Sequence, residues 1–156
     1  MASKQEALAE LDSRHQRFRG AIADLPDAAY AETWLGDWNL SQVLAHMSGW
    51  FNEMTGAMER VQRGERPTPE GVDYSNADEW NAKFSAGAAS GRSALTEWDD
   101  SFRRYREAAA GLGEEKYGAD PEKGRPLIGN RLLQASGIGH FEEHQPQLDE
   151  WLKARG

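Results

Sequence analysis

The chain has 156 residues and is acidic, with 26 Asp and Glu residues against 18 Lys and Arg residues and a net charge of −8. This charge repels a phosphate backbone, so the composition argues against a nucleic-acid partner. The sequence contains no cysteine, which excludes disulfides, thiolate metal ligands and a cysteine nucleophile within the chain.

The length and the hydropathy pattern indicate one domain outside the membrane. A chain of this size can bury an adequate core, so we expect residues 1–156 to form a single domain. No apolar run reaches the roughly 20 residues of a membrane helix, and the first residues lack the features of a secretory signal. We therefore expect no membrane contact and a cytoplasmic location.

The first predicted helix precedes Pro26, which ends it. The helix is predicted because apolar residues recur at spacings of three and four along one face. The stripe consists of Leu8, Leu11, His15, Phe18, Ile22 and Leu25. A single histidine on an apolar face is usually a core residue. We therefore favour a core position for His15 over a place in a functional site.

The second predicted helix begins at Asn39, where Gln42 three residues later completes a capping-box pattern. Its apolar face includes Val43 and Trp50. His46 lies three residues after the first and four before the second, so it shares their buried side. A buried imidazole requires a partner.

A segment dense in Gly and Pro, from Arg63 to Ser75, predicts an irregular crossover. A short helix over 76–88 follows and carries Trp80, Asn81 and Phe84. The third main helix begins near Ser93 and ends at 111–113, and the fourth carries the stripe from Leu133 to Trp151. No strand of clear alternation is present. These features predict an all-α four-helix bundle with a long crossover between the second and third main helices.

The fourth helix contains His140 and His144, which lie four residues apart and therefore on one helical face. This spacing alone also occurs by chance or on solvated faces. Because His46 also occupies an inward position, three of the four histidines can share one ion, and we interpret them as a metal site. Three imidazoles leave coordination positions open, as in catalytic sites. Zinc or nickel suits these ligands best, and iron or manganese also fits.

Several neighbouring residues are candidates for secondary roles. Glu142 and Glu143 can accept a hydrogen bond from a metal-bound imidazole or can simply be solvated. The candidate substrate pocket is aromatic and comprises Trp50, Trp80, Asn81 and Trp98. Aromatic residues also fill cores, so a core role for these side chains stays open.

Three blocks of the sequence, 38–47, 78–82 and 139–146, resemble the DinB/YfiT-type superfamily, and the resemblance extends from Glu6 to Leu152. It implies an up-down-down-up four-helix bundle that is often dimeric, with His46, His140 and His144 as metal ligands. Members include transferases and isomerases that use a low-molecular-weight thiol: mycothiol, bacillithiol or glutathione. Protective relatives of the ClbS/DfsB type share the Gly49-Trp50 pair but often lack the three histidines, so the resemblance favours the metal-dependent branch.

Two classes of function follow from these features. The first is a metal-dependent enzyme, similar to a thiol S-transferase or a hydrolase, that acts on a small electrophilic molecule. The second is a non-catalytic protein that binds or sequesters a small molecule and confers resistance, with a metal that only braces the bundle. The absence of cysteine fits the first class, because the thiol would come from a separate molecule.

Overall fold

The two longest helices of the first half of the chain begin at capping boxes. The computed structural model describes residues 2–156. Helix α1 (Lys4–Ile22) starts at Ser3, whose hydroxyl accepts the Glu6 backbone N–H at 3.2 Å. Helix α2 (Leu40–Gln62) starts at Asn39, where Asn39 Oδ1 accepts the Gln42 N–H and Gln42 Oε1 accepts the Asn39 N–H, both at 2.9 Å. The predicted start of the second helix is confirmed.

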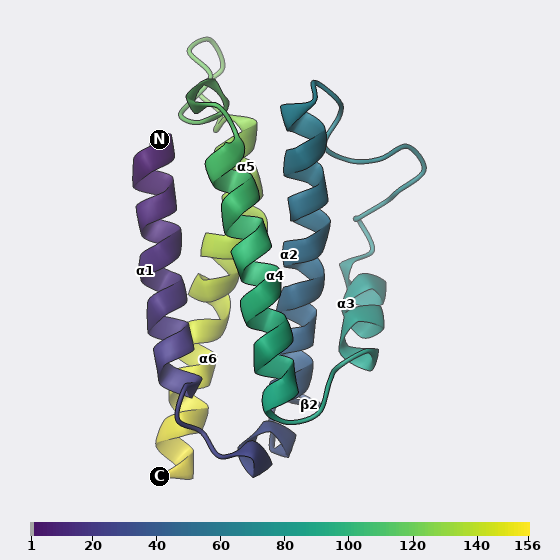
Figure 1. Cartoon of the computed structure of the whole chain (residues 1–156), viewed down its shortest axis with the longest axis vertical. Helices are drawn as coiled ribbons and strands as arrows, with labels where there is room; N and C mark the ends of the chain where they lie inside the picture. Colours follow the sequence, from purple (N-terminus) through teal and green to yellow (C-terminus); the bar gives the residue numbers. More distant parts are fainter. Residues whose placement is uncertain (1) are drawn as a thin grey trace.

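Four helical rods lie side by side along the long axis of the molecule, and the predicted all-α class is confirmed. In Figure 1 the chain runs down α1, up α2, up α4 and down through α5 and α6. The helices of the second half are α4 (Arg92–Gly111), α5 (Ile128–Leu133) and α6 (Gly139–Arg155), with short 3-10 turns η1 (Asp27–Ala31) and η2 (Glu114–Lys116) in the connections. No helix among residues 2–156 is both long and apolar enough to cross a membrane.

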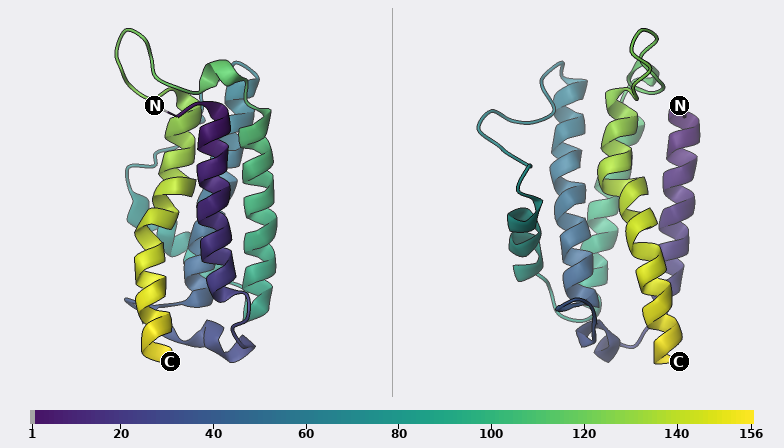
Figure 2. Two further views of the ribbon diagram at one scale, coloured as in Figure 1. Left: turned by 90° about the vertical axis from the view of Figure 1, so that its left-hand side faces the viewer. Right: turned by 180° about the vertical axis from the view of Figure 1, so that it is seen from behind.

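The crossover between α2 and α4 contains one short helix, α3 (Ala77–Ala86), close to the predicted range. It lies outside the four rods, against α2, in both Figure 1 and the rear view of Figure 2. The chain between α2 and α3 forms no regular element, as the Gly and Pro content predicts.

A small hairpin precedes α2, where the sequence predicts no strand. Strands β1 (Thr33–Leu35) and β2 (Trp38–Asn39) pair antiparallel, and Gly36 in the turn has a φ of 61°. Strands of three and two residues are too short for an alternating pattern to be recognised. The hairpin matters because it directs the Trp38 ring against His46, with ring centroids 5.1 Å apart.

The sequence predicts one continuous fourth helix, but in the structure this last rod is interrupted. A π-helical turn, η3 (Gln134–Ile138), separates α5 from α6. Gly137 in this turn lies so close to two other helices that an added Cβ would lie 2.7 Å from Leu11 Cδ1 and 2.9 Å from the Tyr105 hydroxyl. That hydroxyl donates a hydrogen bond of 2.8 Å to the Leu132 carbonyl. Such turns are frequent near functional sites, and here α6 and its histidines follow directly.

The centre of the bundle is an aromatic core that includes His15. The imidazole stacks on Phe102, with centroids 3.7 Å apart and planes at 4°, and on Trp98 at 5.1 Å. Its Nε2 has no hydrogen-bond partner among the described residues, and burial lowers the pKa of His15 to about 4. His15 is therefore a neutral core residue, which is the role favoured from the sequence.

Replacing His15 by Phe should reduce the acid sensitivity of the protein. The pKa of His15 is lower in the folded chain than its ordinary value of 6.5, so its contribution to stability is complete above that value and is lost as the pH falls toward 4. Between pH 7 and pH 5, urea unfolding of the metal-free protein should show a larger loss of unfolding free energy for the wild type than for His15→Phe, by about 1–2 kcal/mol. The other histidines are the same in both proteins, so parallel pH curves would contradict a neutral His15 in the core.

Candidate metal centre

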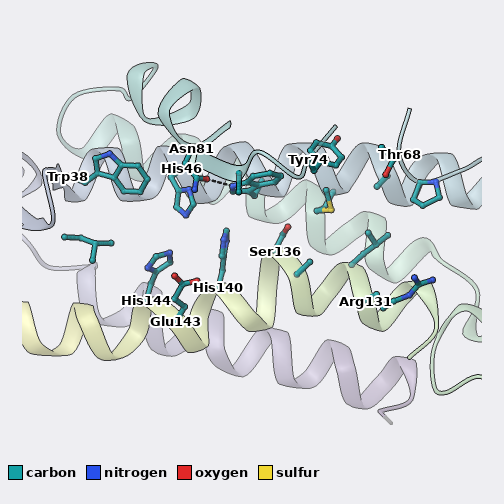
Figure 3. Close-up of a pocket in the computed structure, with 18 of the residues that line it drawn as sticks. Trp38, His46, Thr68, Tyr74, Asn81, Arg131, Ser136, His140, Glu143 and His144 are labelled. Carbon is teal, nitrogen blue, oxygen red and sulfur yellow. Dashed lines mark hydrogen bonds between the residues drawn. The ribbon is translucent and has the colours of Figure 1, made fainter. Parts of the chain in front are cut away.

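The structure brings together the three histidines that the sequence groups as a metal site. His46 extends from α2, and His140 and His144 extend from α6 toward it (Figure 3). One ring nitrogen from each lies within 4.8 Å of the others. The ring centroids are separated by 4.9 Å for His46 and His140, 5.4 Å for His46 and His144, and 5.5 Å for His140 and His144. This group could hold a metal ion.

The environment of the three rings suits a metal ligand set. His46 and His144 are each only 4% exposed, and His140 is partly buried. Each of these three rings has one buried nitrogen without a hydrogen-bond partner among the described residues: Nδ1 of His46, Nδ1 of His140 and Nε2 of His144. Burial lowers the pKa of His46 to about 4 and that of His140 to about 3. Both rings are therefore neutral near pH 7, with lone pairs available for an ion.

The orientation of His144 is set by Gln147, a residue that the sequence did not single out. His144 Nδ1 donates to Gln147 Oε1 at 2.8 Å, because an amide oxygen can only accept. This bond assigns the proton to Nδ1 and leaves the lone pair on Nε2. Metal-binding histidines usually have such a second partner. The available signal was the spacing of three residues between the two side chains along one helix.

The two glutamates considered for that role lie on different sides of α6. Glu143 lines the cleft beside His144 (Figure 3). Glu142 instead faces α1, with its carboxylate 3.3 Å from the Arg14 guanidinium. Adjacent residues of a helix point about 100° apart, so both carboxylates cannot face the same site.

The three histidines form part of the wall of a cleft of about 910 Å³. The cleft lies between α2 on one side and α5, η3 and α6 on the other (Figure 3). Trp38 from the hairpin and Tyr74 from the crossover also line it. Its volume is at the upper end of the range typical of small-molecule sites, so the histidines are accessible to a ligand of substantial size.

The four predicted pocket residues occupy three different places. Trp50 and Asn81 line the cleft, and Trp50 Nε1 donates to Asn81 Oδ1 at 2.6 Å. Trp80 packs behind them, 5.0 Å from the Tyr74 ring, and its Nε1 donates to the Asp73 carbonyl at 2.8 Å.

The fourth, Trp98, is fully buried in the aromatic core and does not line the cleft. Its stacking partners are His15 of α1 and Phe102 of its own helix. Helical periodicity predicts that a side chain points inward, but it does not identify the helices that it meets. The structure therefore moves Trp98 from the predicted pocket to the core.

Helix α3 is seated on α2 at a position without a side chain. The Phe84 ring occupies the space in which a Cβ of Gly49 would lie. The same ring packs edge-on against Trp50 at 5.4 Å. Gly49 thus allows the close approach that positions Asn81 over the cleft.

The sequence matches the family model of the DinB superfamily over residues 10–145. The chain belongs to the DinB superfamily. This membership confirms the resemblance noted from the three sequence blocks. No curated protein matches the chain in sequence.

Solved structures share the DinB fold across nearly the whole chain at low identity. The structure named Sibling Lethal Factor Precursor, DfsB, has a TM-score of 0.79 at 16% identity and covers 99% of this chain and 98% of its own. The colibactin self-resistance protein ClbS, in complex with double-stranded DNA, has a TM-score of 0.71 at 14% identity, covering 96% and 95%. The mycothiol-dependent maleylpyruvate isomerase has a TM-score of 0.71 at 17% identity, covering 95% of this chain and 63% of its own.

These likenesses establish the fold, and the proteins that share it include an isomerase and a self-resistance protein. One relative was crystallised with DNA, whereas the acidic composition of this chain predicts no nucleic-acid partner. For this chain, that expectation stays a prediction.

Substituting Gly49 by Ala should displace α3 from α2. The added methyl group overlaps the Phe84 ring, so we expect a loss of about 1–3 kcal/mol in unfolding free energy and a shift in the fluorescence of Trp50. Gly20→Ala is the matched control, because no atom lies within 4 Å of its added Cβ and alanine favours the helix. Equal stability of the two variants would contradict the close seating of α3.

Proposed function

We propose that this DinB protein binds a divalent metal ion through His46, His140 and His144 and uses it to activate a nucleophile against a small electrophilic molecule. The observation that carries the proposal is the convergence of three imidazoles, each with a buried and unpartnered ring nitrogen, on the wall of a large cleft. Zinc and nickel are the favoured ions, and iron and manganese also suit imidazole ligands.

The histidines would hold the ion from two helices and leave its remaining positions open to the cleft. Gln147 keeps His144 in the tautomer that binding requires. A bound ion would supply Lewis-acid chemistry, lowering the pKa of a thiol or of a water molecule that binds to it. The aromatic side chains at the cleft wall, Trp38 and Trp50, would exclude bulk water and contact the apolar part of a substrate.

In this proposal Glu143 would accept the proton that the nucleophile loses. Its carboxylate lies at the cleft wall next to His144 (Figure 3). Because the chain contains no cysteine, a thiol nucleophile has to come from a separate molecule. The mycothiol-dependent maleylpyruvate isomerase supports this choice, since a DinB relative there depends on an external thiol.

Loss of any one histidine of the group should abolish stoichiometric metal binding. In tag-free protein we expect one ion per chain by mass spectrometry, and a near-complete loss for His46→Ala, His140→Ala and His144→Ala. His15→Phe, outside the cleft, is the control and should retain the metal. Gln147→Ala should weaken affinity by about 10–100-fold, because it frees the His144 ring. Wild-type protein that binds no divalent metal would contradict the proposal.

The metal-loaded protein should consume a thiol in the presence of an electrophilic aryl halide or epoxide. Replacement of Glu143 by Gln should lower the rate by at least about tenfold, because the proton acceptor is lost. Glu142→Gln is the matched control and should react normally, since its carboxylate faces Arg14 instead of the cleft. Hydrolysis of an activated ester, followed in parallel without thiol, distinguishes water from thiol as the nucleophile.

A second candidate is sequestration of a small molecule without catalysis. It is favoured by the aromatic group beside the cleft, in which Trp50, Tyr74 and Trp80 contact one another. The self-resistance relative ClbS supports it as a use of this fold. A protein of this class would bind its ligand in unchanged form and would retain binding in the His140→Ala variant.

A further inference from the structure

The cleft has a cationic side chain at the end remote from the histidines. Arg131 of α5 lines the cleft, and Figure 3 shows it beyond Ser136 on the side away from His144. It is the one Arg or Lys side chain among the described residues that line the cleft. The other charged side chain, Glu143, lies beside the histidines, so the two ends of the cleft differ in charge.

The Arg131 guanidinium has no protein partner within residues 2–156, neither an ion pair nor a side-chain hydrogen bond. Eight other arginines of this acidic chain form ion pairs with carboxylates. Arg66 and Arg125 also have no side-chain partner among the described residues, but neither lines the cleft, so Arg131 is distinguished by its position. Acidic residues outnumber basic residues in this chain, so carboxylates are available to pair with most of the arginines. An unpaired guanidinium that lines a ligand-sized cleft is therefore available to a ligand.

The space between the two ends is lined mainly by apolar side chains. They come from α2 and from the rod opposite: Met54, Ala57, Leu132 and Ala135. His140 lies nine positions after Arg131 along a nearly continuous helical rod. At 1.5 Å per residue, their backbones are about 13 Å apart. A ligand that reaches both ends is thus elongated and has an apolar middle.

We propose that Arg131 binds the carboxylate of an elongated small molecule whose apolar middle lies along Met54 and Leu132 and whose other end reaches the histidine site. This inference rests on the proposed function for the reacting end only. A guanidinium donates two parallel N–H bonds to a carboxylate, and one unpaired Arg matches the single negative charge of that group. The ligand, whether the substrate or the thiol, would accordingly carry one carboxylate group, at the end remote from its reacting atom.

The test uses ω-mercaptocarboxylates of increasing chain length, each paired with the ω-mercaptoalcohol of equal length. Binding to zinc-loaded and to metal-free protein is measured by calorimetry. Wild-type protein should bind the acid about threefold to tenfold more tightly than the alcohol in both metal states, because Arg131 acts without the ion. Arg131→Gln should remove this preference. Arg125→Gln, an exposed arginine outside the cleft, is the matched control and should keep it.

Chain length separates this inference from the proposed function. In zinc-loaded protein, acids long enough to span the two ends should bind more tightly than short ones, and chelation of zinc should remove that advantage. Equal binding of acid and alcohol by wild-type protein, or an unchanged preference in Arg131→Gln, would overturn the role of Arg131. A preference that depends on Arg131 but shows no gain with length in zinc-loaded protein would support the carboxylate site and overturn the single spanning ligand. Failure to bind any of zinc, nickel, iron and manganese, with the preference intact, would overturn the proposed function alone.

Discussion

Three imidazoles packed between α2 and α6, two helices of opposite direction, are the feature around which the rest of the cleft is arranged. Burial keeps His46 and His140 uncharged near pH 7, and the hydrogen bond from His144 to Gln147 selects its tautomer. A buried nitrogen without a partner costs free energy, which binding of an ion would offset. Both helices would contribute ligands, because α2 provides one ring and α6 provides two.

The irregular parts of the fold shape the space around these rings. The hairpin directs Trp38 against His46, and the seating of Phe84 on Gly49 brings Asn81 to Trp50. The π-helical turn precedes α6 and accommodates the close approach of α1 and α4 at Gly137. Segments outside the regular helices therefore determine which side chains a ligand would meet, whereas the four rods supply a rigid frame.

The two ends of the cleft differ in charge, and in our proposal one end carries the reaction and the other binds a carboxylate. The histidines and Glu143 occupy one end, and Arg131 occupies the other, with apolar side chains between them. Such an arrangement allows binding energy gained far from the reacting atoms to position them. The same fold serves proteins with different uses, an isomerase and a self-resistance protein among them, so specificity would arise from differences in the cleft lining.

The sequence by itself determined the helical class, the start of α2 at Asn39 and the placing of His46, His140 and His144 on inward faces. These features depend on local capping and on a periodicity of 3.6 residues, which are properties of single helices. The tertiary structure alone decided that Trp98 belongs to the core, that Glu143 faces the cleft while Glu142 binds Arg14, and that Gln147 orients His144. It also introduced the hairpin and the π-helical turn. The physical reason is that periodicity identifies the buried side of a helix, but only packing determines which neighbouring helix, cavity or charge that side meets.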